Sequence, residues 1–270
     1  MPAKMQSYPS MTRYVITYFD QILAVAGSEF QKMRHDPVDL LTRAIQPALW
    51  LTLFGEVMAQ VRGLSASNVG YLDFLAAGVL AQSVLFVAIF FGLSAIWERD
   101  LGILQRYLVS PAPRSALVIG KALSASLRGL SQGTIIYLLA LMLGLDVNLS
   151  PIGILGAALL ITLGASLFST LSLVIACLVK SRERFMGIGQ VLTMPIFFAS
   201  SAIYPLALMP SWMQILAKGN PLSYEVDALR TIMIKGVDSV LGLPADFAVL
   251  TVLTALLITI AARLYPRLGV

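Results

Sequence analysis

The sequence predicts an all-α integral membrane protein, and its composition, its apolar stretches and its charge distribution all indicate this class. The chain has 270 residues, of which 58% are hydrophobic and only 12% are charged. Soluble domains carry about 25% charged residues, so this chain has too few charges to cover a water-facing surface of its size. Disordered chains need low hydrophobicity and high charge. The composition therefore argues strongly against a soluble enzyme and excludes a disordered chain.

Six apolar stretches are long enough, or nearly so, to cross a bilayer, which takes about 20 residues in a helix. Spanning segments must be helical because lipid offers exposed backbone groups no partner. We expect spans over residues 44–59, 71–97, 115–145, 152–179, 186–204 and 246–264. The third and fourth exceed the hydrocarbon thickness and could tilt or kink. Together the six spans form one transmembrane domain over residues 1–270.

Basic residues divide unequally between the two sides that six spans define. Fourteen Lys and Arg residues fall on one side: before the first span, in the loops after the second and fourth spans or in the adjoining span ends, and at or near the C-terminus. Four fall on the opposite side, and Arg128 lies inside a span. Because basic loops stay in the cytoplasm, we expect a multi-pass protein of the plasma (bacterial inner) membrane with both termini cytoplasmic. The net charge of +5 then reflects these loops, and no nucleic-acid partner is expected.

The N-terminal region, residues 1–43, is predicted to be cytoplasmic and to contain an interfacial helix over residues 18–34. Apolar side chains fall along one side of that helix: Ile22, Ala26, Phe30 and Met33. Asp36-Pro37 then ends it. An amphipathic helix before a span is typical of a segment lying in the membrane interface, although an ordinary helix packed on the spans would show the same pattern.

The region of residues 205–235, on the outer side, is too apolar for a free loop and too interrupted for one spanning helix. Its prolines are Pro205, Pro210 and Pro221. We expect two short re-entrant helices that enter the outer leaflet, with Trp212 and Tyr224 as interfacial anchors. A plain surface loop is the alternative.

Residues for autonomous chemistry are scarce. Gly120-Lys121 is the only Gly-Lys pair, and Ala122 follows it where a phosphate-binding loop needs Ser or Thr. His35 is the only histidine and Cys177 the only cysteine, so neither a Cys-based or two-His metal site nor a Ser/His/Asp triad can form within one chain. We predict no catalytic residue, no metal and no cofactor in this chain.

Intramembrane polar residues are also few. An ion-coupled carrier would place carboxylates near the bilayer midplane, but Glu56, Asp73 and Asp146 fall at or beyond the ends of spans. The remaining polar candidates within the spans are Arg128, Gln82, Gln132 and Gln190. A buried Arg is a functional candidate, although it could also pair structurally or extend to the interface.

The loop after the second span, residues 98–111, predicts a short amphipathic helix. At helical spacing one stripe is apolar: Leu101, Leu104 and Leu108. The opposite side carries Arg99, Gly102 and Arg106. Ser110-Pro111 ends the helix. This pattern fits either a solvated loop helix or a docking helix for a soluble partner.

This segment resembles the coupling-helix signature of type-2 ATP-binding-cassette (ABC) transporter permeases, the transmembrane subunits of drug-resistance and polysaccharide exporters. Further segments resemble the same family in the same order: Gln46-Pro47-Ala48-Leu49-Trp50 with Phe54-Gly55, Tyr71 to Gly78, Pro210-Ser211-Trp212, Asn220-Pro221-Leu222-Ser223-Tyr224 and Ala228-Leu229-Arg230. Ala77 departs from the family pattern, since many members have proline there. The resemblance covers nearly the whole chain.

The resemblance implies a half-transporter. Two copies of this chain would form the pathway, and two copies of a cytoplasmic ABC ATPase subunit, which bind ATP and Mg, would dock below them. Matching positions assign the coupling residues Glu98, Arg99, Gly102, Arg106 and Pro111. The outer re-entrant region would comprise Pro210, Trp212, Asn220, Pro221 and Tyr224. Membrane lipid would surround the remaining surface.

The expected cargo is an amphipathic drug- or lipid-like small molecule, moved outward, because the predicted span faces are aliphatic and aromatic with scattered glutamines. A polysaccharide or glycolipid exporter would need aromatic platforms, for which Phe197 and Phe198 are candidates. An ion-coupled secondary carrier and a non-transporting membrane scaffold are weaker alternatives.

Overall fold

The computed structural model describes residues 18, 20–24, 26, 27, 31, 42, 45–60, 70–105, 113–179 and 181–269. In these residues the elements are helices and helical turns, together with one isolated antiparallel bridge between Val147 and Ile234. The α-helices are α3 (Gly55–Ala59), α4 (Tyr71–Asp100), α6 (Arg114–Met142), α7 (Pro151–Leu178), α8 (Arg182–Phe198), α9 (Ser211–Gly219), α10 (Pro221–Met233) and α11 (Leu243–Leu264). The shorter turns are the π-helical η1 (Trp50–Phe54) and the 3-10 segments η2 (Leu206–Leu208) and η3 (Tyr265–Gly269).

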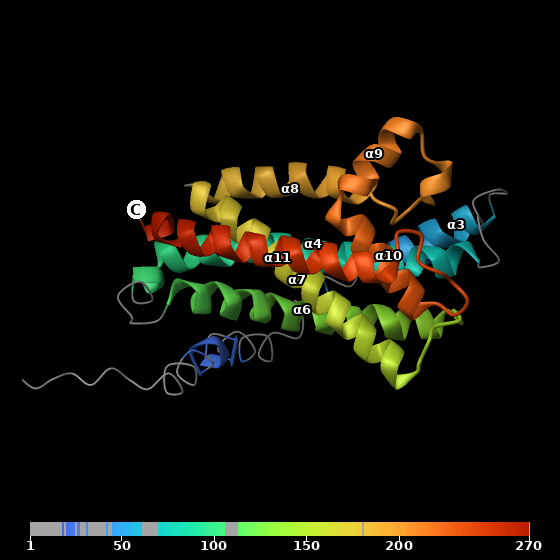
Figure 1. The fold of residues 1–270 in the computed structure, drawn as a ribbon, viewed down its shortest axis with the longest axis horizontal. Helices are drawn as coiled ribbons and strands as arrows, with labels where there is room; N and C mark the ends of the chain where they lie inside the picture. Colours follow the sequence, from blue (N-terminus) through green and yellow to red (C-terminus); the bar gives the residue numbers. More distant parts are fainter. Residues whose placement is uncertain are drawn as a thin grey trace, which may run out of the picture.

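The long helices lie side by side and alternate in direction (Figure 1). α4 packs on α6 and α7, and α7 also packs on α11. At one end, the Glu98 end, α4, α7 and α11 finish while α6 and α8 begin. The opposite end, the Asp227 end, holds α9 and α10, which are inserted between α8 and α11. The bundle therefore has two ends with different structures.

Among the residues that the structure describes, three helices are long and apolar enough to cross a membrane: Tyr71–Asp100, Pro151–Leu178 and Leu243–Leu268. α6 carries three basic residues, and α8 has only 17 residues with Pro195 inside. α8 ends at Phe198 rather than near Tyr204 as expected, because the chain turns there: Ser200 Oγ donates to the Phe197 carbonyl oxygen and accepts from the Ala202 amide. The structure thus supports membrane-crossing helices without fixing their number at six.

The helix starts follow capping rules that the sequence displays. Ser150 caps α7, where its hydroxyl accepts from the Gly153 amide, and Pro151 occupies the first helical position. Asn220 and Pro221 repeat this arrangement at α10. A side-chain acceptor followed by a proline with fixed φ satisfies the free amides of a helix start. These caps fix where α7 and α10 begin.

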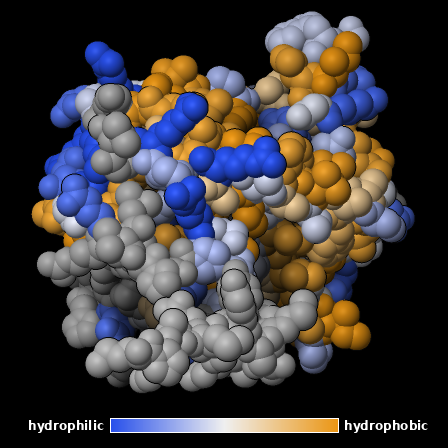
Figure 2. Space-filling model, turned by 60° about the vertical axis from the view of Figure 1, so that its left-hand side comes forward, coloured by the Kyte–Doolittle hydropathy of each residue, from blue (hydrophilic) through white to orange (hydrophobic). Residues whose placement is uncertain are grey.

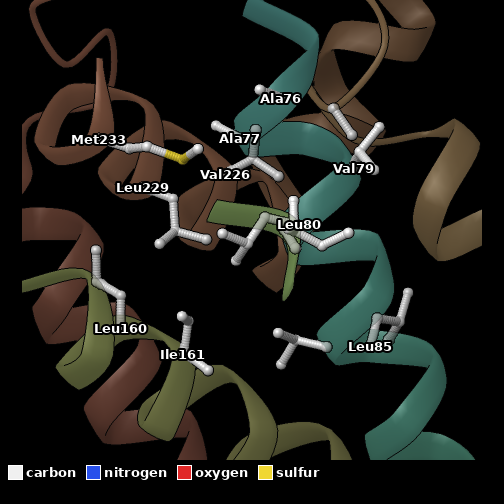
Figure 3. Close-up of a cluster of buried hydrophobic side chains, with 14 of the residues drawn as sticks. Ala76, Ala77, Val79, Leu80, Leu85, Leu160, Ile161, Val226, Leu229 and Met233 are labelled. Atoms are coloured by element: carbon white, nitrogen blue, oxygen red, sulfur yellow. The ribbon is translucent and has the colours of Figure 1, made fainter. Parts of the chain in front are cut away.

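The core joins α4, α7 and α10 (Figure 3). Four apolar residues of α10 recur at helical spacing, and all are fully buried: Leu222, Val226, Leu229 and Met233. In Figure 3 several of them face Ala77 and Leu80 of α4 and Leu160 and Ile161 of α7. α10 is therefore a core helix of the bundle, whereas α9 exposes Trp212, Ile215 and Leu216.

The N-terminal helix is described only in part. Residues 20–24, 26, 27 and 31 are helical, with Ile22 and Ala26 buried and Asp20 exposed, as the predicted stripe requires. The Tyr18 hydroxyl donates to Ser115 Oγ at the start of α6, at 3.1 Å. Phe30 and Met33 lie outside the described residues. The described part thus contacts the bundle at its Glu98 end.

Candidate functional site

The last turn of α4 is joined to α6 by an ion pair inside the protein. Lys121 Nζ donates to Glu98 Oε2 at 2.6 Å, and the two side chains are 8% and 11% exposed. Removing one partner of such a pair leaves a buried charge without compensation, which costs about 3–5 kcal/mol. The pair therefore fixes the position of Glu98 relative to α6.

A second set of charges joins the same turn to the start of α8. Asp100 Oδ1 accepts from Arg99 at 3.0 Å, and Asp100 Oδ2 accepts from Arg182 Nε at 2.8 Å. The Arg182 guanidinium also lies 5.9 Å from the centre of the Trp97 ring. These groups are partly exposed, so each contact contributes little to stability. Their importance is geometric, since they connect two helices next to the loop that follows α4.

The predicted helix over residues 98–111 is not one continuous helix in its described part. Glu98 and Arg99 belong to α4, which continues to Asp100, and Gly102 then adopts a φ of 71°. This left-handed conformation favours glycine and breaks the helical repeat. Leu101 is consequently 72% exposed, although Leu104, in the turn that follows, is fully buried.

Arg106, Leu108 and Pro111 lie outside the described residues. The described site is therefore the end of α4 with its contacts to α6 and α8. Figure 2 shows hydrophilic side chains gathered on this side of the molecule, next to a broad hydrophobic surface. This arrangement suits an end of the bundle that leaves the hydrocarbon and meets water.

The intramembrane polar candidates do not form one cluster. Gln82 of α4 is buried and lines a cavity of about 170 Å³ together with Gln46, Phe86 and Phe90. Gln132 of α6 is also buried, but Gln190 is exposed on α8. Arg128 is half-buried, and its guanidinium lies 5.7 Å from the centre of the Phe91 ring on α4.

The predicted outer residues take several roles at the Asp227 end. Pro210 precedes α9, and Trp212 on that helix is 63% exposed. Asn220 caps α10 and also donates from Nδ2 to the Ile196 carbonyl oxygen at 2.6 Å, while Pro221 starts that helix. The Tyr224 hydroxyl donates to the Lys218 carbonyl oxygen at 2.7 Å, which ties α10 to α9.

Three charged residues of α10 are buried, which the sequence pattern did not predict. Arg230 donates to the Ser201 carbonyl oxygen at 2.9 Å and to the Phe74 carbonyl oxygen at 3.3 Å, with its guanidinium 3.5 Å from the Phe74 ring centre. Asp227 Oδ2 accepts from Ser239 Oγ and from the Leu241 amide, both at 2.8 Å.

Glu225, the third, is fully buried against Gly164, at the middle of the 28-residue α7. The expectation that carboxylates fall only at or beyond span ends therefore fails for this residue. The apolar spacing of residues 222, 226, 229 and 233 is the signal that could have identified α10 as a core helix.

The fold and this site define an all-helical membrane protein in which ion pairs connect the helices at one end. Residues 20–234 match the family described as ABC-2 type transporter. The chain therefore belongs to the ABC-2 type transporter family. In this family the membrane subunit works with a separate ATPase subunit.

Relatives support the same assignment. The transport permease ycf38 of Porphyra purpurea is 30% identical over 224 residues, which cover 81% of this chain and 76% of the relative. The daunorubicin resistance ABC transporter permease protein DrrB1 of Streptomyces coeruleorubidus is 26% identical, covering 74% of this chain and 70% of the relative. Nodulation protein J of Rhizobium leguminosarum bv. trifolii is 29% identical, covering 72% and 74%. The chain is thus similar over most of its length to permeases and to a nodulation protein.

Proposed function

We propose that this chain is the transmembrane subunit of an ATP-driven exporter, which moves amphipathic drug- or lipid-like small molecules out across the plasma membrane. In this proposal six segments cross the membrane, both termini are cytoplasmic, and the Glu98 end faces the cytoplasm. Two copies of the chain form the pathway. Two copies of a cytoplasmic ATPase subunit bind ATP and Mg and supply the energy.

The contacts at the end of α4 are the observation that carries the proposal. A soluble partner can drive a membrane helix only through a stiff connection with defined packing. The buried pair of Glu98 and Lys121 provides that stiffness toward α6, and Asp100 provides a contact toward α8. A force applied to the loop after α4 would therefore reach three helices. The proposed contact residues are Glu98, Arg99, Gly102, Arg106 and Pro111.

The proposed cargo rests on surface chemistry and on one relative. The exposed faces of α8 and α11 are rich in apolar residues, including Val191 and Val252. The cavity beside Gln82 combines amide and aromatic groups. DrrB1 is named for daunorubicin resistance, which supports a drug-like cargo. A polysaccharide or glycolipid remains the alternative, although Phe197 is buried at 2% exposure beside Trp50 and is not free to form a platform.

Reconstitution tests this proposal. The purified chain in lipid nanodiscs should hydrolyse no ATP alone, and it should support hydrolysis and efflux of a fluorescent amphipathic drug once its ATPase subunit is added. Drug efflux driven by an ion gradient without ATP would overturn the proposal in favour of a secondary carrier. ATP-dependent efflux of a lipid-linked sugar, with no efflux of the drug, would overturn the proposed cargo alone.

A further inference from the structure

We infer that Glu225 is a proton-binding site inside the bundle, held as the neutral carboxylic acid, and that its protonation keeps α10 seated against α7. The ligand is one proton, exchanged with water when the carboxyl ionises. This inference goes beyond the proposed transport function and does not depend on the ATPase contact.

The first observation is the burial of a carboxyl group without a partner. Glu225 is 0% exposed, and within the described part of the chain neither Oε1 nor Oε2 has a hydrogen-bond partner. An ionised carboxylate in such surroundings is far more costly than a neutral one, since bulk solvent does not reach it and no described side chain compensates its charge.

The second observation is how closely this carboxyl approaches α7. A Cβ atom built on Gly164 would collide with the Glu225 carboxyl carbon and both of its oxygens. Glycine at position 164 is therefore what allows the acid to lie against the helix backbone. Because Gly164 is at the middle of α7, the carboxyl is far from both ends of that helix.

The third observation concerns the charges on the helices that pack against α10, which are α4, α7, α9 and α11. Their titratable and charged residues are Tyr71, Asp73, Glu98, Arg99 and Asp100 on α4, Cys177 on α7, Lys218 on α9, and Asp246 and Arg263 on α11. Within the described residues none of them forms an ion pair or hydrogen bond with Glu225. On α10 itself the Arg230 guanidinium contacts Ser201 and Phe74, and Asp227 contacts Ser239.

Ionisation would change this contact in a definite direction. Loss of the proton would leave a negative charge between α7 and α10, and hydration of that charge would require the helices to separate. A carboxyl protonated in the folded state and ionised in the unfolded state stabilises the fold less as the pH rises. The free energy of unfolding should therefore fall as the pH rises from about 4, where a glutamate of the unfolded chain ionises, until the folded carboxyl itself ionises.

Infrared spectroscopy of the full-length protein in lipid nanodiscs tests the inference. The wild-type spectrum minus that of Glu225→Gln should show the carbonyl stretching band of a protonated carboxylic acid at neutral pH. Asp146→Asn, at a carboxylate with a 72% exposed side chain paired with Lys235, is the matched control and should show no such band. A carboxylate band in the Glu225 difference spectrum would overturn the inference.

Thermal unfolding as a function of pH provides the second readout. As the pH rises from about 4, the wild-type midpoint should fall by more than that of Glu225→Gln, because only the wild type releases a proton at this position on unfolding. Equal slopes for the two proteins would contradict the inference. If Glu225→Gln does not fold, wild-type protein labelled with ¹³C at the glutamate carboxyls should still show the isotope-shifted band of a protonated acid. Absence of that band would contradict the inference.

Discussion

Glu98 and Lys121 form an ion pair inside the bundle, with 2.6 Å between Glu98 Oε2 and Lys121 Nζ. Glu98 is in the last turn of α4 and Lys121 is near the start of α6, so the pair joins two helices across the loop that is proposed to meet the ATPase. The loop after α4 thus begins from a fixed point in the structure.

Lys121→Met should destabilise the protein by about 3–5 kcal/mol, because it leaves the Glu98 carboxylate buried without its cation. The double variant Glu98→Gln/Lys121→Met should lose less stability than Lys121→Met alone, since neither charge remains in the interior. Denaturant unfolding in detergent measures both. Asp146→Asn is the control, because it breaks an exposed pair whose contribution is about 0–1 kcal/mol. If Lys121→Met and Asp146→Asn lower the free energy of unfolding equally, the internal pair does not stabilise the protein more than the exposed pair does.

Gly164→Ala should destabilise the contact between α7 and α10 by about 1–3 kcal/mol, the usual effect of adding a group to a filled interior. The added methyl would collide with the Glu225 carboxyl. Gly187→Ala on α8 is the matched control, since no atom lies within 4 Å of the new methyl and alanine favours a helix. Thermal unfolding of both variants tests this prediction. An unfolding midpoint of Gly164→Ala equal to that of the wild type would contradict the described packing.

Arg230→Lys should lose about 1.5–3 kcal/mol of stability, the range for hydrogen bonds to a charged group. The guanidinium bonds two carbonyl oxygens, on Ser201 and Phe74, and covers the Phe74 ring, which a lysine ammonium cannot reproduce. Arg263→Lys, at an exposed position of α11, is the matched control, because it makes the same substitution at a site without these contacts. Hydrogen exchange at residues 199–203 should increase in Arg230→Lys alone, and equal protection in both variants would count against this role.

Gly102→Ala should reduce drug-stimulated ATP hydrolysis of the assembled transporter several-fold. Alanine in the left-handed conformation costs about 1–2 kcal/mol, so the turn after α4 would shift. Gly144→Ala is a close match, because Gly144 has a φ of 73° against 71° at Gly102, and neither has an atom within 4 Å of the added methyl. The two variants should lose similar stability, but only Gly102→Ala should uncouple hydrolysis. Equal hydrolysis would contradict the proposed role of the turn.

The apolar sequence predicts the long helices well. The expected spans 71–97, 152–179 and 246–264 correspond to α4 at 71–100, α7 at 151–178 and α11 at 243–264. Continuous apolar runs bounded by Gly, Pro and Ser leave little choice of conformation or limits. α10 is harder to predict, because Pro221 and its charged residues resemble a surface segment while its apolar residues at positions 222, 226, 229 and 233 belong to the core.

The functional residues were less predictable for a physical reason. The pairing of Glu98 with Lys121 and of Asp100 with Arg182 depends on how α4 meets α6 and α8, and no local pattern encodes that contact. Gly102 also ends the helical repeat, so Leu101 and Leu104 do not share the expected stripe, and Leu108 lies outside the described residues. Arg106 and Pro111 lie outside the described residues, and their contact with an ATPase stays a prediction.

Co-purification tests the central claim most directly. The chain should bring down its ATPase subunit in equal number from solubilised membranes. Arg106→Glu, in the proposed contact, should release that subunit, while Lys218→Glu, the same charge reversal on α9, should retain it. Release by both variants or by neither would contradict docking at the loop after α4. If no ATPase accompanies even the wild-type chain, the proposed half-transporter itself is contradicted.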